Sequence, residues 1–484
     1  MSFIETTART PYALGFDSLT HEVTNQNLPV DGTLPEWLTG VLLRNGPATF
    51  EAATAGYRHW FDGQAMLHRF AVGGGRVCYT NRALDTPNAR AVRHDGRIGF
   101  MEFATDPCQA GFARIAARYT GKFKVAANPN VNITKVGGRF LALTETPLPV
   151  EFDPETLQTL GVTGYDDDVS GHLTTAHPHR DPASGDLINY VTRISRKSEY
   201  RVYRLRGPNL KRELVGSVPV SRPAYMHTFG ICDGYMVLAE FPFVVSPLEM
   251  LLRGVPLIEN YRWRPDRGTR FIVMDLRDGS VRGTYHAPAF FAFHHINAFV
   301  DGDDLVVDAC AYDDARIIDA LYLDKLRAGR NVVPTPIPTR YRIDLDRGDV
   351  TVRRLTDETL ELPRIAYDAR NGRDYRFVYG VGVRNRLGTD FANQLVKADV
   401  TTGGTRLWTA DGCYPGEPVF VAAPGGAAED DGVLLSVVLD SRRRTSYLLV
   451  LDARTFAEVA RAEVPHPIPF GFHGQFHPES NQEQ

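Results

Sequence analysis

The feature of this chain that most restricts its fold is a set of four histidines that lie far apart in the sequence. They occur in Thr-Ala-His-Pro, Tyr-Met-His-Thr-Phe-Gly, Phe-Ala-Phe-His-His-Ile-Asn and Phe-His-Gly, as His177, His227, His294 and His473. Each follows or ends an apolar, strand-like stretch, and no single helix or loop could carry them all. A histidine taken alone is more often a surface or core residue. Imidazoles that converge on one point, however, form a metal site by default.

Most of the chain consists of short strand-like segments separated by tight turns. Typical apolar runs lie at 137–145, 234–240, 303–310 and 432–440. Gly/Asp clusters such as Gly73-Gly74-Gly75 and Asp278-Gly279 are typical of hairpin turns. Short candidate helices lie at 109–118, 246–255 and 315–327. No repeat is visible at the residue level, but so many short strands in a long chain favour radial repetition over a sandwich.

Length and composition are those of an ordinary globular protein. The 484 residues carry a formal net charge of −4, which gives no indication of a nucleic-acid partner. Five scattered cysteines without a Cys-x-x-Cys pair argue against a disulfide framework or a thiolate metal site. No apolar stretch is long enough to span a membrane, and the first residues contain no signal-peptide core. We therefore expect a cytoplasmic protein with one domain over residues 1–484, in which 331–339 and 421–427 are loops.

Other patterns in the sequence have ordinary explanations. Asp166-Asp167-Asp168 suggests a cation site but is more typical of a solvated turn. The glycines at 380 and 382 are not followed by the strand–helix unit of a phosphate-binding loop. The 58 acidic residues could include a glycosidase-like carboxylate pair, but none stands out.

Three glutamates lie in apolar or turn contexts and need an explanation. They are Glu145, Glu361 and Glu417. A buried carboxylate without a partner is costly. A buried carboxylate that accepts the Nδ1–H of a metal-bound imidazole has a partner, and it leaves Nε2 free for the metal. The alternative is an ordinary salt bridge with an arginine.

With these motifs the chain resembles a known family, the carotenoid cleavage oxygenases. This family splits carotenoids and stilbenes and includes the visual-cycle retinoid isomerase. The resemblance runs from Gly-Val-Leu-Leu-Arg-Asn-Gly-Pro at 40–47, through His-Trp-Phe-Asp-Gly at 59–63, to Phe-His-Gly at 472–474, and covers all four histidine segments. It implies an all-β fold, a seven-bladed β-propeller with a cap of short helices and loops over an iron on the propeller axis.

The resemblance also implies roles for individual residues. The four histidines would be the ligands of one Fe(II) per chain, and O2 would be the second substrate. Glu145, Glu361 and Glu417 would bind His227, His294 and His473 in that order, and His177 would have no glutamate partner. Val131 would partly shield one open iron position. Since neighbouring residues on a strand face opposite ways, His294 and His295 cannot both point at the axis, and the motif favours His294.

The substrate class is inferred from the residue before the first of these glutamates. Relatives that cleave phenolic stilbenes carry a lysine near this glutamate, whereas this chain has Thr144. We therefore expect a carotenoid or apocarotenoid, cleaved into two carbonyl products. Val131, Thr144 and Tyr225 are candidates for the substrate pocket. Stilbene or phenylpropene cleavage and retinoid isomerisation remain as alternatives.

The most apolar segment of the chain, residues 241–258, predicts a contact with membranes. Ser246 and Pro247 are typical of the N-cap and first position of a helix. Gly254 and Pro256 would end it. An apolar stripe follows helical spacing on one face, at Leu248, Leu251, Leu252 and Val255. Such a stripe usually packs on a core. Here it could instead lie on a membrane surface, with Arg253, Arg262 and Arg264 at the headgroups.

Overall fold

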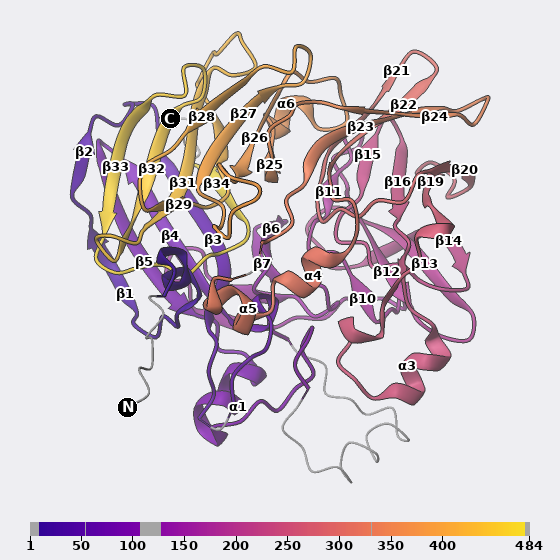
Figure 1. Ribbon diagram of the computed structural model, residues 1–484, viewed down its shortest axis with the longest axis horizontal. Helices are drawn as coiled ribbons and strands as arrows, with labels where there is room; N and C mark the ends of the chain where they lie inside the picture. Colours follow the sequence, from indigo (N-terminus) through magenta and orange to yellow (C-terminus); the bar gives the residue numbers. More distant parts are fainter. Residues whose placement is uncertain (1–8, 54, 107–126, 331, 480–484) are drawn as a thin grey trace, which may run out of the picture.

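The protein is a seven-bladed β-propeller (Figure 1). The structure is a computed structural model, and it describes residues 9–53, 55–106, 127–330 and 332–479. Each blade is an antiparallel sheet of at least four strands. The expected all-β propeller fold is therefore confirmed.

The first four blades are built mainly from the N-terminal part of the chain. Blade 1 has the order β1 (Val23–Asn27), β5 (Arg76–Ala83), β4 (Gln64–Gly73), β3 (Gly40–Thr49) and β34 (Gly474–Pro478). Blade 2 comprises β6 (Asn132–Val136), β7 (Arg139–Leu143), β8 (Val150–Phe152) and β9 (Thr159–Val162). Blade 3 comprises β10 (Leu173–Thr174), β11 (His179–Arg180), β12 (Leu187–Arg193), β13 (Ser198–Leu205) and β14 (Arg212–Val220). Blade 4 comprises β15 (Gly230–Cys232), β16 (Tyr235–Glu240), β19 (Thr269–Asp275) and β20 (Val281–Ala287).

The other three blades complete the ring. Blade 5 comprises β21 (His295–Asp301), β22 (Asp304–Ala311), β23 (Ile337–Asp344) and β24 (Val350–Arg354). Blade 6 comprises β25 (Glu361–Arg364), β26 (Phe377–Gly382), β27 (Gln394–Asp399) and β28 (Thr405–Trp408). Blade 7 comprises β2 (Val30–Gly32), β33 (Glu458–Val464), β32 (Thr445–Asp452), β31 (Gly432–Asp440), β29 (Cys413–Pro415) and β30 (Val419–Ala422). A separate two-stranded ribbon joins β17 (Phe243–Val244) to β18 (Arg262–Trp263).

Two of the blades combine strands from opposite ends of the chain. In blade 1 the last strand, β34, pairs with β3, so that Arg44 lies opposite Gly474. In blade 7 the early strand β2 pairs with β33. These two pairings close the ring. They also place the segment before β34 against strands that were made near the start of the chain.

The middle strands of the blades are buried on both faces, because neighbouring blades pack face to face. Strand β32 is buried at Ser446 and at every residue from Tyr447 to Leu451, and β12 shows the same pattern. Such strands are continuous apolar runs rather than alternating ones. Leu435 and Leu448 of blade 7, for example, share one apolar cluster with Leu42 and Phe70 of blade 1.

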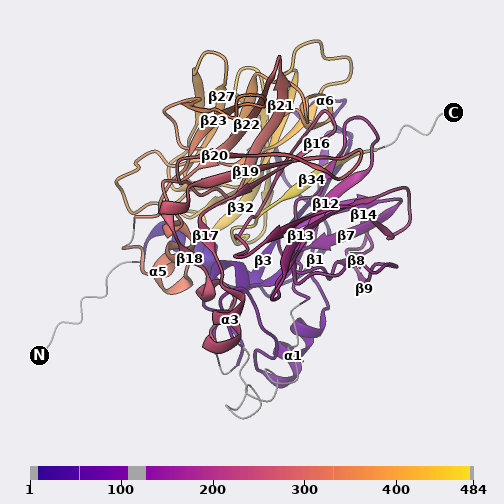
Figure 2. The same ribbon diagram turned by 90° about the vertical axis from the view of Figure 1, so that its right-hand side faces the viewer.

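Helices α1 and α3 lie below the sheets in both views, whereas α6 lies near the top, on the opposite side of the propeller (Figures 1 and 2). The α-helices are α1 (Pro87–Asp95), α3 (Pro247–Arg253), α4 (Arg316–Ala320), α5 (Leu323–Ala328) and α6 (Tyr367–Arg370). The 3-10 helices are η1 (Pro11–Phe16), η2 (Trp60–Asp62), η3 (Ile258–Asn260) and η4 (Pro265–Arg267). The candidate helix at 109–118 lies outside the described residues. Among the described helices, none is both long and apolar enough to cross a membrane.

The predicted helix that begins after Ser246 is confirmed as α3. The Ser246 side chain accepts a hydrogen bond from the Glu249 amide, and Gly254 ends the helix with a φ of 62°. Leu248 and Leu252 are 68% and 71% exposed, whereas Met250 packs against the main apolar cluster. The side chain of Leu251 lies outside the described part of the structure.

Candidate metal centre

The four histidines identified in the sequence come together in the structure. His294 and His473 directly precede β21 and β34, His227 lies in the loop before β15, and His177 lies between β10 and β11. His227 and His294 therefore precede the first strands of blades 4 and 5, and His473 precedes the strand that completes blade 1, whereas His177 lies between two strands of blade 3. Strands β15, β21 and β25, and likewise β30, β34 and β6, contact one another across blade boundaries, so these ends surround one point.

The distances between the imidazoles are those of ligands of one ion. Nε2 of His177 lies 3.1 Å from Nε2 of His227, and Nε2 of His294 lies 3.2 Å from Nε2 of His473. All four candidate ligand nitrogens lie within 4.8 Å of one another. Metal–imidazole bonds are about 2.0–2.1 Å long, so two ligands at a right angle are about 3 Å apart.

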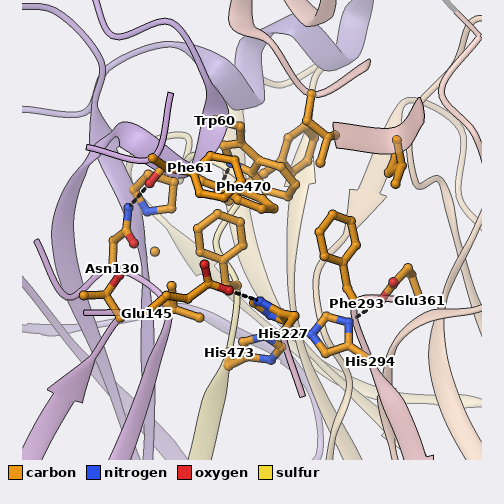
Figure 3. A pocket seen from close by; sticks show the side chains of 18 of the residues that line it. Trp60, Phe61, Asn130, Glu145, His227, Phe293, His294, Glu361, Phe470 and His473 are labelled. Carbon is orange, nitrogen blue, oxygen red and sulfur yellow. Dashed lines mark hydrogen bonds and ion pairs between the residues drawn. The ribbon is translucent and has the colours of Figure 1, made fainter. Parts of the chain in front are cut away.

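Three of the four rings are oriented by a glutamate. Nδ1 of His227 lies 2.6 Å from Oε1 of Glu145, and Nδ1 of His294 lies 2.6 Å from Oε2 of Glu361 (Figure 3). These two contacts place Nδ1–H on the carboxylate and leave the lone pair of Nε2 pointing at the shared point.

The third such contact joins His473 to Glu417, with Nδ1 and Oε1 2.7 Å apart. The side chain of Glu417 is almost fully buried, and its other oxygen accepts a hydrogen bond from the Gly474 amide at 2.9 Å. The described residues include no carboxylate that is hydrogen-bonded to the His177 ring. The backbone amide of His177 donates a hydrogen bond to the Thr175 hydroxyl.

Burial favours the neutral form of His177 and His473. It lowers the pKa of His177 well below the ordinary value, and the neighbouring histidines lower it further. Burial also lowers the pKa of His473 to about 4, although Glu417 acts in the opposite direction. Neutral imidazole is the form that binds a metal ion, so the site can do so at neutral pH.

The donor set fits a divalent transition-metal ion. Nitrogen lone pairs about 3 Å apart repel each other unless a cation or a proton lies between them. Nδ1 of three of the four rings already bonds to a glutamate, and burial opposes protonation of His177 and His473. Imidazole is a good ligand for iron, zinc, copper and nickel. The residues present therefore fit the expected iron.

A large cavity of about 1140 Å³ opens beside the histidines. Its walls near the cluster are aromatic, from Trp60, Phe61, Phe293 and Phe470 (Figure 3). His227, His294 and His473 contribute to its wall, and so do Val131 and Thr144. The cavity also reaches Leu248 and Met250 of α3. A long apolar molecule therefore has space between α3 and the four histidines.

Tyr225 does not belong to the cavity wall that the structure describes. It is buried behind Glu145, and its hydroxyl donates a hydrogen bond of 2.8 Å to Oε1 of that residue. Tyr312, which sequence reasoning missed, has the corresponding place beside Glu361, with its hydroxyl 3.2 Å from Oε1. An aromatic lining was expected from the family resemblance, but its individual residues were not identified, although Phe-Ala-Phe-His and His-Trp-Phe-Asp contain three of them.

Comparisons with known proteins agree with this arrangement. The family described as retinal pigment epithelial membrane protein matches residues 16–478. The carotenoid isomerooxygenase of Galleria mellonella is 36% identical, with 94% of each chain covered. The mitochondrial carotenoid-cleaving dioxygenase of Homo sapiens is 33% identical, over 92% of this chain and 87% of its own.

A solved structure supports the same assignment. Cobalt-substituted Synechocystis ACO superimposes with a TM-score of 0.86 at 26% identity, covering 97% of this chain and 98% of that chain. The predicted resemblance is thus confirmed by the family match, by the curated relatives and by the fold. The chain is an enzyme of the retinal pigment epithelial membrane protein family, to which the carotenoid cleavage oxygenases belong.

Proposed function

We propose that the protein is a non-haem Fe(II) dioxygenase that uses O2 to cleave a conjugated C=C bond of a carotenoid or apocarotenoid into two carbonyl products. The observation that carries this proposal is the convergence of four imidazoles, three of which line a large and largely apolar cavity. The names of the relatives, which include carotenoid-cleaving and β,β-carotene dioxygenases, support the substrate class.

The proposed ligands are His177, His227, His294 and His473. Bound iron would supply the binding and activation of O2, with open coordination positions because the ligand set has only four members. The protein's own part is to hold the ion, to position the polyene and to exclude water. The aromatic rings around the cluster suit a flat, apolar polyene, which buries its surface against them. Val131, 8% exposed and on the cavity wall, is proposed to shield part of the site.

Thr144 supports a polyene substrate over a phenolic stilbene. It lines the cavity directly before Glu145, and its short neutral side chain has no charge for a phenolate oxygen. A lysine ammonium at this place could bind such an oxygen. A second candidate is cleavage coupled to isomerisation, which the name of the Galleria mellonella relative favours.

We also propose that α3 docks on a membrane and delivers the substrate. Leu248 is exposed and yet contributes to the cavity wall, so the apolar surface of the helix is continuous with the cavity. Arg253 and Arg264 are exposed near the helix and could contact lipid headgroups. Arg262 is half-buried and donates hydrogen bonds to the carbonyls of Glu259 and Tyr261, so it has a local role instead.

One assay separates the candidates. The iron-loaded protein is incubated with a carotenoid, an apocarotenal, a 4-hydroxystilbene and a retinyl ester, each with and without O2, and products are identified by mass. Carbonyl fragments of the polyenes that form only with O2 would support the proposal. Faster cleavage of the stilbene would contradict the substrate class. Products formed equally well without O2 would contradict the dioxygenase reaction.

A further inference from the structure

The three glutamates beside the histidines have different partners. Glu145 accepts a hydrogen bond from the Tyr225 hydroxyl, and Glu361 accepts from the Tyr312 hydroxyl and the Leu362 amide. Glu417 lies between two guanidinium groups instead. Its Oε1 is 3.3 Å from Nε of Arg364, and its Oε2 is 3.8 Å from Nη1 of Arg44. Among the ion pairs of the described residues, Glu417 is thus the one of these three glutamates that is paired with arginines.

Arg44 connects Glu417 to β34, the strand that completes blade 1. The side chain is buried on β3, opposite Gly474 of β34. Its Nη1 donates to the Glu417 carbonyl and its Nη2 to the Phe472 carbonyl, both at 3.1 Å. Arg44 thus holds the backbone of the glutamate and the backbone next to His473 at the same time.

Arg364 makes the matching contact from blade 6. It is the last residue of β25, and it reaches Glu417 with Nε while Nη2 donates a hydrogen bond to the Gly474 carbonyl. The guanidinium is a quarter exposed, so this side of the arrangement is easier to alter than Arg44. Residues from blades 1, 6 and 7 therefore meet around one carboxylate.

We infer that Arg44 and Arg364 are positioning residues for His473, which clamp Glu417 against β34 so that closure of the propeller orients the fourth histidine. The inference rests on the proposed metal-binding role of His473. The inference gives Glu417 a different role from Glu145 and Glu361. The charge of Glu417 is balanced by the two arginines, which leaves Glu145 and Glu361 to balance a bound cation.

The electrostatics agree with a clamp of this kind. A buried carboxylate is costly without a partner, and the guanidinium groups of Arg364 and Arg44 supply the opposite charge for Glu417. Removal of one partner from such a buried pair leaves an uncompensated charge, which is strongly destabilising. Glu145 and Glu361 have no arginine in an ion pair with them among the described residues, so their replacement leaves no such charge.

The experiment uses Co(II) as the probe, titrated anaerobically into metal-free protein and followed by its visible absorption. Arg364→Met should weaken Co(II) binding by about 10-fold or more and change the absorption bands, and Arg364→Lys should restore most of the affinity. The matched control is Arg340→Met in blade 5, which removes the partner of the buried Asp308, a carboxylate bonded to Arg340 and Tyr375 rather than to a histidine. The control should lower the unfolding temperature and leave Co(II) affinity unchanged.

A second measurement needs no metal. Glu417→Gln should lower the unfolding temperature of the metal-free protein by on the order of 5 °C, because Arg44 and Arg364 lose their counter-charge. Adding Arg364→Met to Glu417→Gln should recover part of that loss, whereas Glu145→Gln alone should cause little change.

The outcomes are distinct. Wild-type Co(II) affinity in Arg364→Met, or equal weakening by Arg340→Met, would overturn the inference while leaving the proposed function intact. Lack of recovery in the double variant would overturn the clamp as well. If the wild-type protein bound no Co(II) and no iron, the proposed function itself would fail, and this inference with it.

Discussion

His294 and His295 point to opposite sides of the strand that they begin. Nε2 of His294 lies 3.2 Å from Nε2 of His473 in the histidine cluster, whereas Nδ1 of His295 lies 2.8 Å from the hydroxyl of Thr228. This alternation is a consequence of extended backbone, in which successive side chains face opposite ways. It makes two adjacent residues of the same type suitable for a matched comparison.

His294→Ala should abolish activity and reduce bound iron, because it removes a proposed ligand. His295→Ala should retain iron, although loss of its half-buried side chain, which bonds to Thr228, should lower stability by about 1–3 kcal/mol. Metal analysis and turnover of both purified variants provide the test. Full iron content in His294→Ala together with an inactive, iron-free His295→Ala would show that the ligand choice is wrong.

Glu145→Gln and Glu361→Gln should each weaken iron binding or turnover by roughly 10–100-fold while the protein remains folded. The physical reason is that an amide oxygen accepts the Nδ1–H bond more weakly than a carboxylate and does not balance the charge of the ion. Iron titration, turnover and circular dichroism would be measured together. Glu151→Gln, on β8 and paired with Arg139, is the control for loss of a carboxylate elsewhere. Wild-type iron affinity and turnover in both Glu145→Gln and Glu361→Gln would show that these glutamates have only a structural role.

Leu248→Asp combined with Leu252→Asp should weaken liposome binding and slow the turnover of membrane-delivered carotenoid. Both side chains are exposed, so stability and iron content should not change. Turnover of a short, dispersed apocarotenal should be spared. The matched control is Leu160→Asp with Leu407→Asp, which alters exposed leucines on β9 and β28. Equal liposome binding by wild-type protein and the α3 variant would remove the docking role.

The metal-free protein should lose stability as the pH is lowered from about 6.5 towards 3. Burial lowers the pKa of His59 and of His68 to about 3, below the value of about 6.5 in an unfolded chain. Between these values the unfolded state binds more protons, so stability is fully present above pH 6.5 and declines below it. Urea unfolding of His68→Gln should show a shallower decline than the wild type. The control is a change of the exposed His286 to Gln, which should leave the slope of stability against pH the same as in the wild type. A wild-type slope in His68→Gln would contradict the prediction.

The sequence allowed the propeller and the grouping of histidines to be predicted, because each histidine lies in a distinct local motif. The expected order of glutamate partners is also the order in which hydrogen bonds join Glu145, Glu361 and Glu417 to their histidines. These relations follow from short segments that a reader of the sequence can recognise. They describe geometry, and the roles in catalysis remain for the experiments above.

Contacts between residues far apart in the chain could not be predicted in the same way. Arg44 and Arg364 carry no local signal that connects them to Glu417. Asp167 looked like part of a solvated turn, yet its side chain is buried in an ion pair with Arg212 at 2.8 Å. In both cases the partner is supplied by another strand of the fold, and a window of sequence contains only one side of the pair.

Because β34 pairs with β3, the histidine site can be completed only after the last strand of the chain has been synthesised. During synthesis, His177, His227 and His294 leave the ribosome while the ring is still open. His473 follows some 180 residues after His294, directly before the strand that completes blade 1. A nascent or truncated chain therefore carries three of the four imidazoles but cannot assemble the whole set. Metal loading would then report that translation and ring closure are both complete.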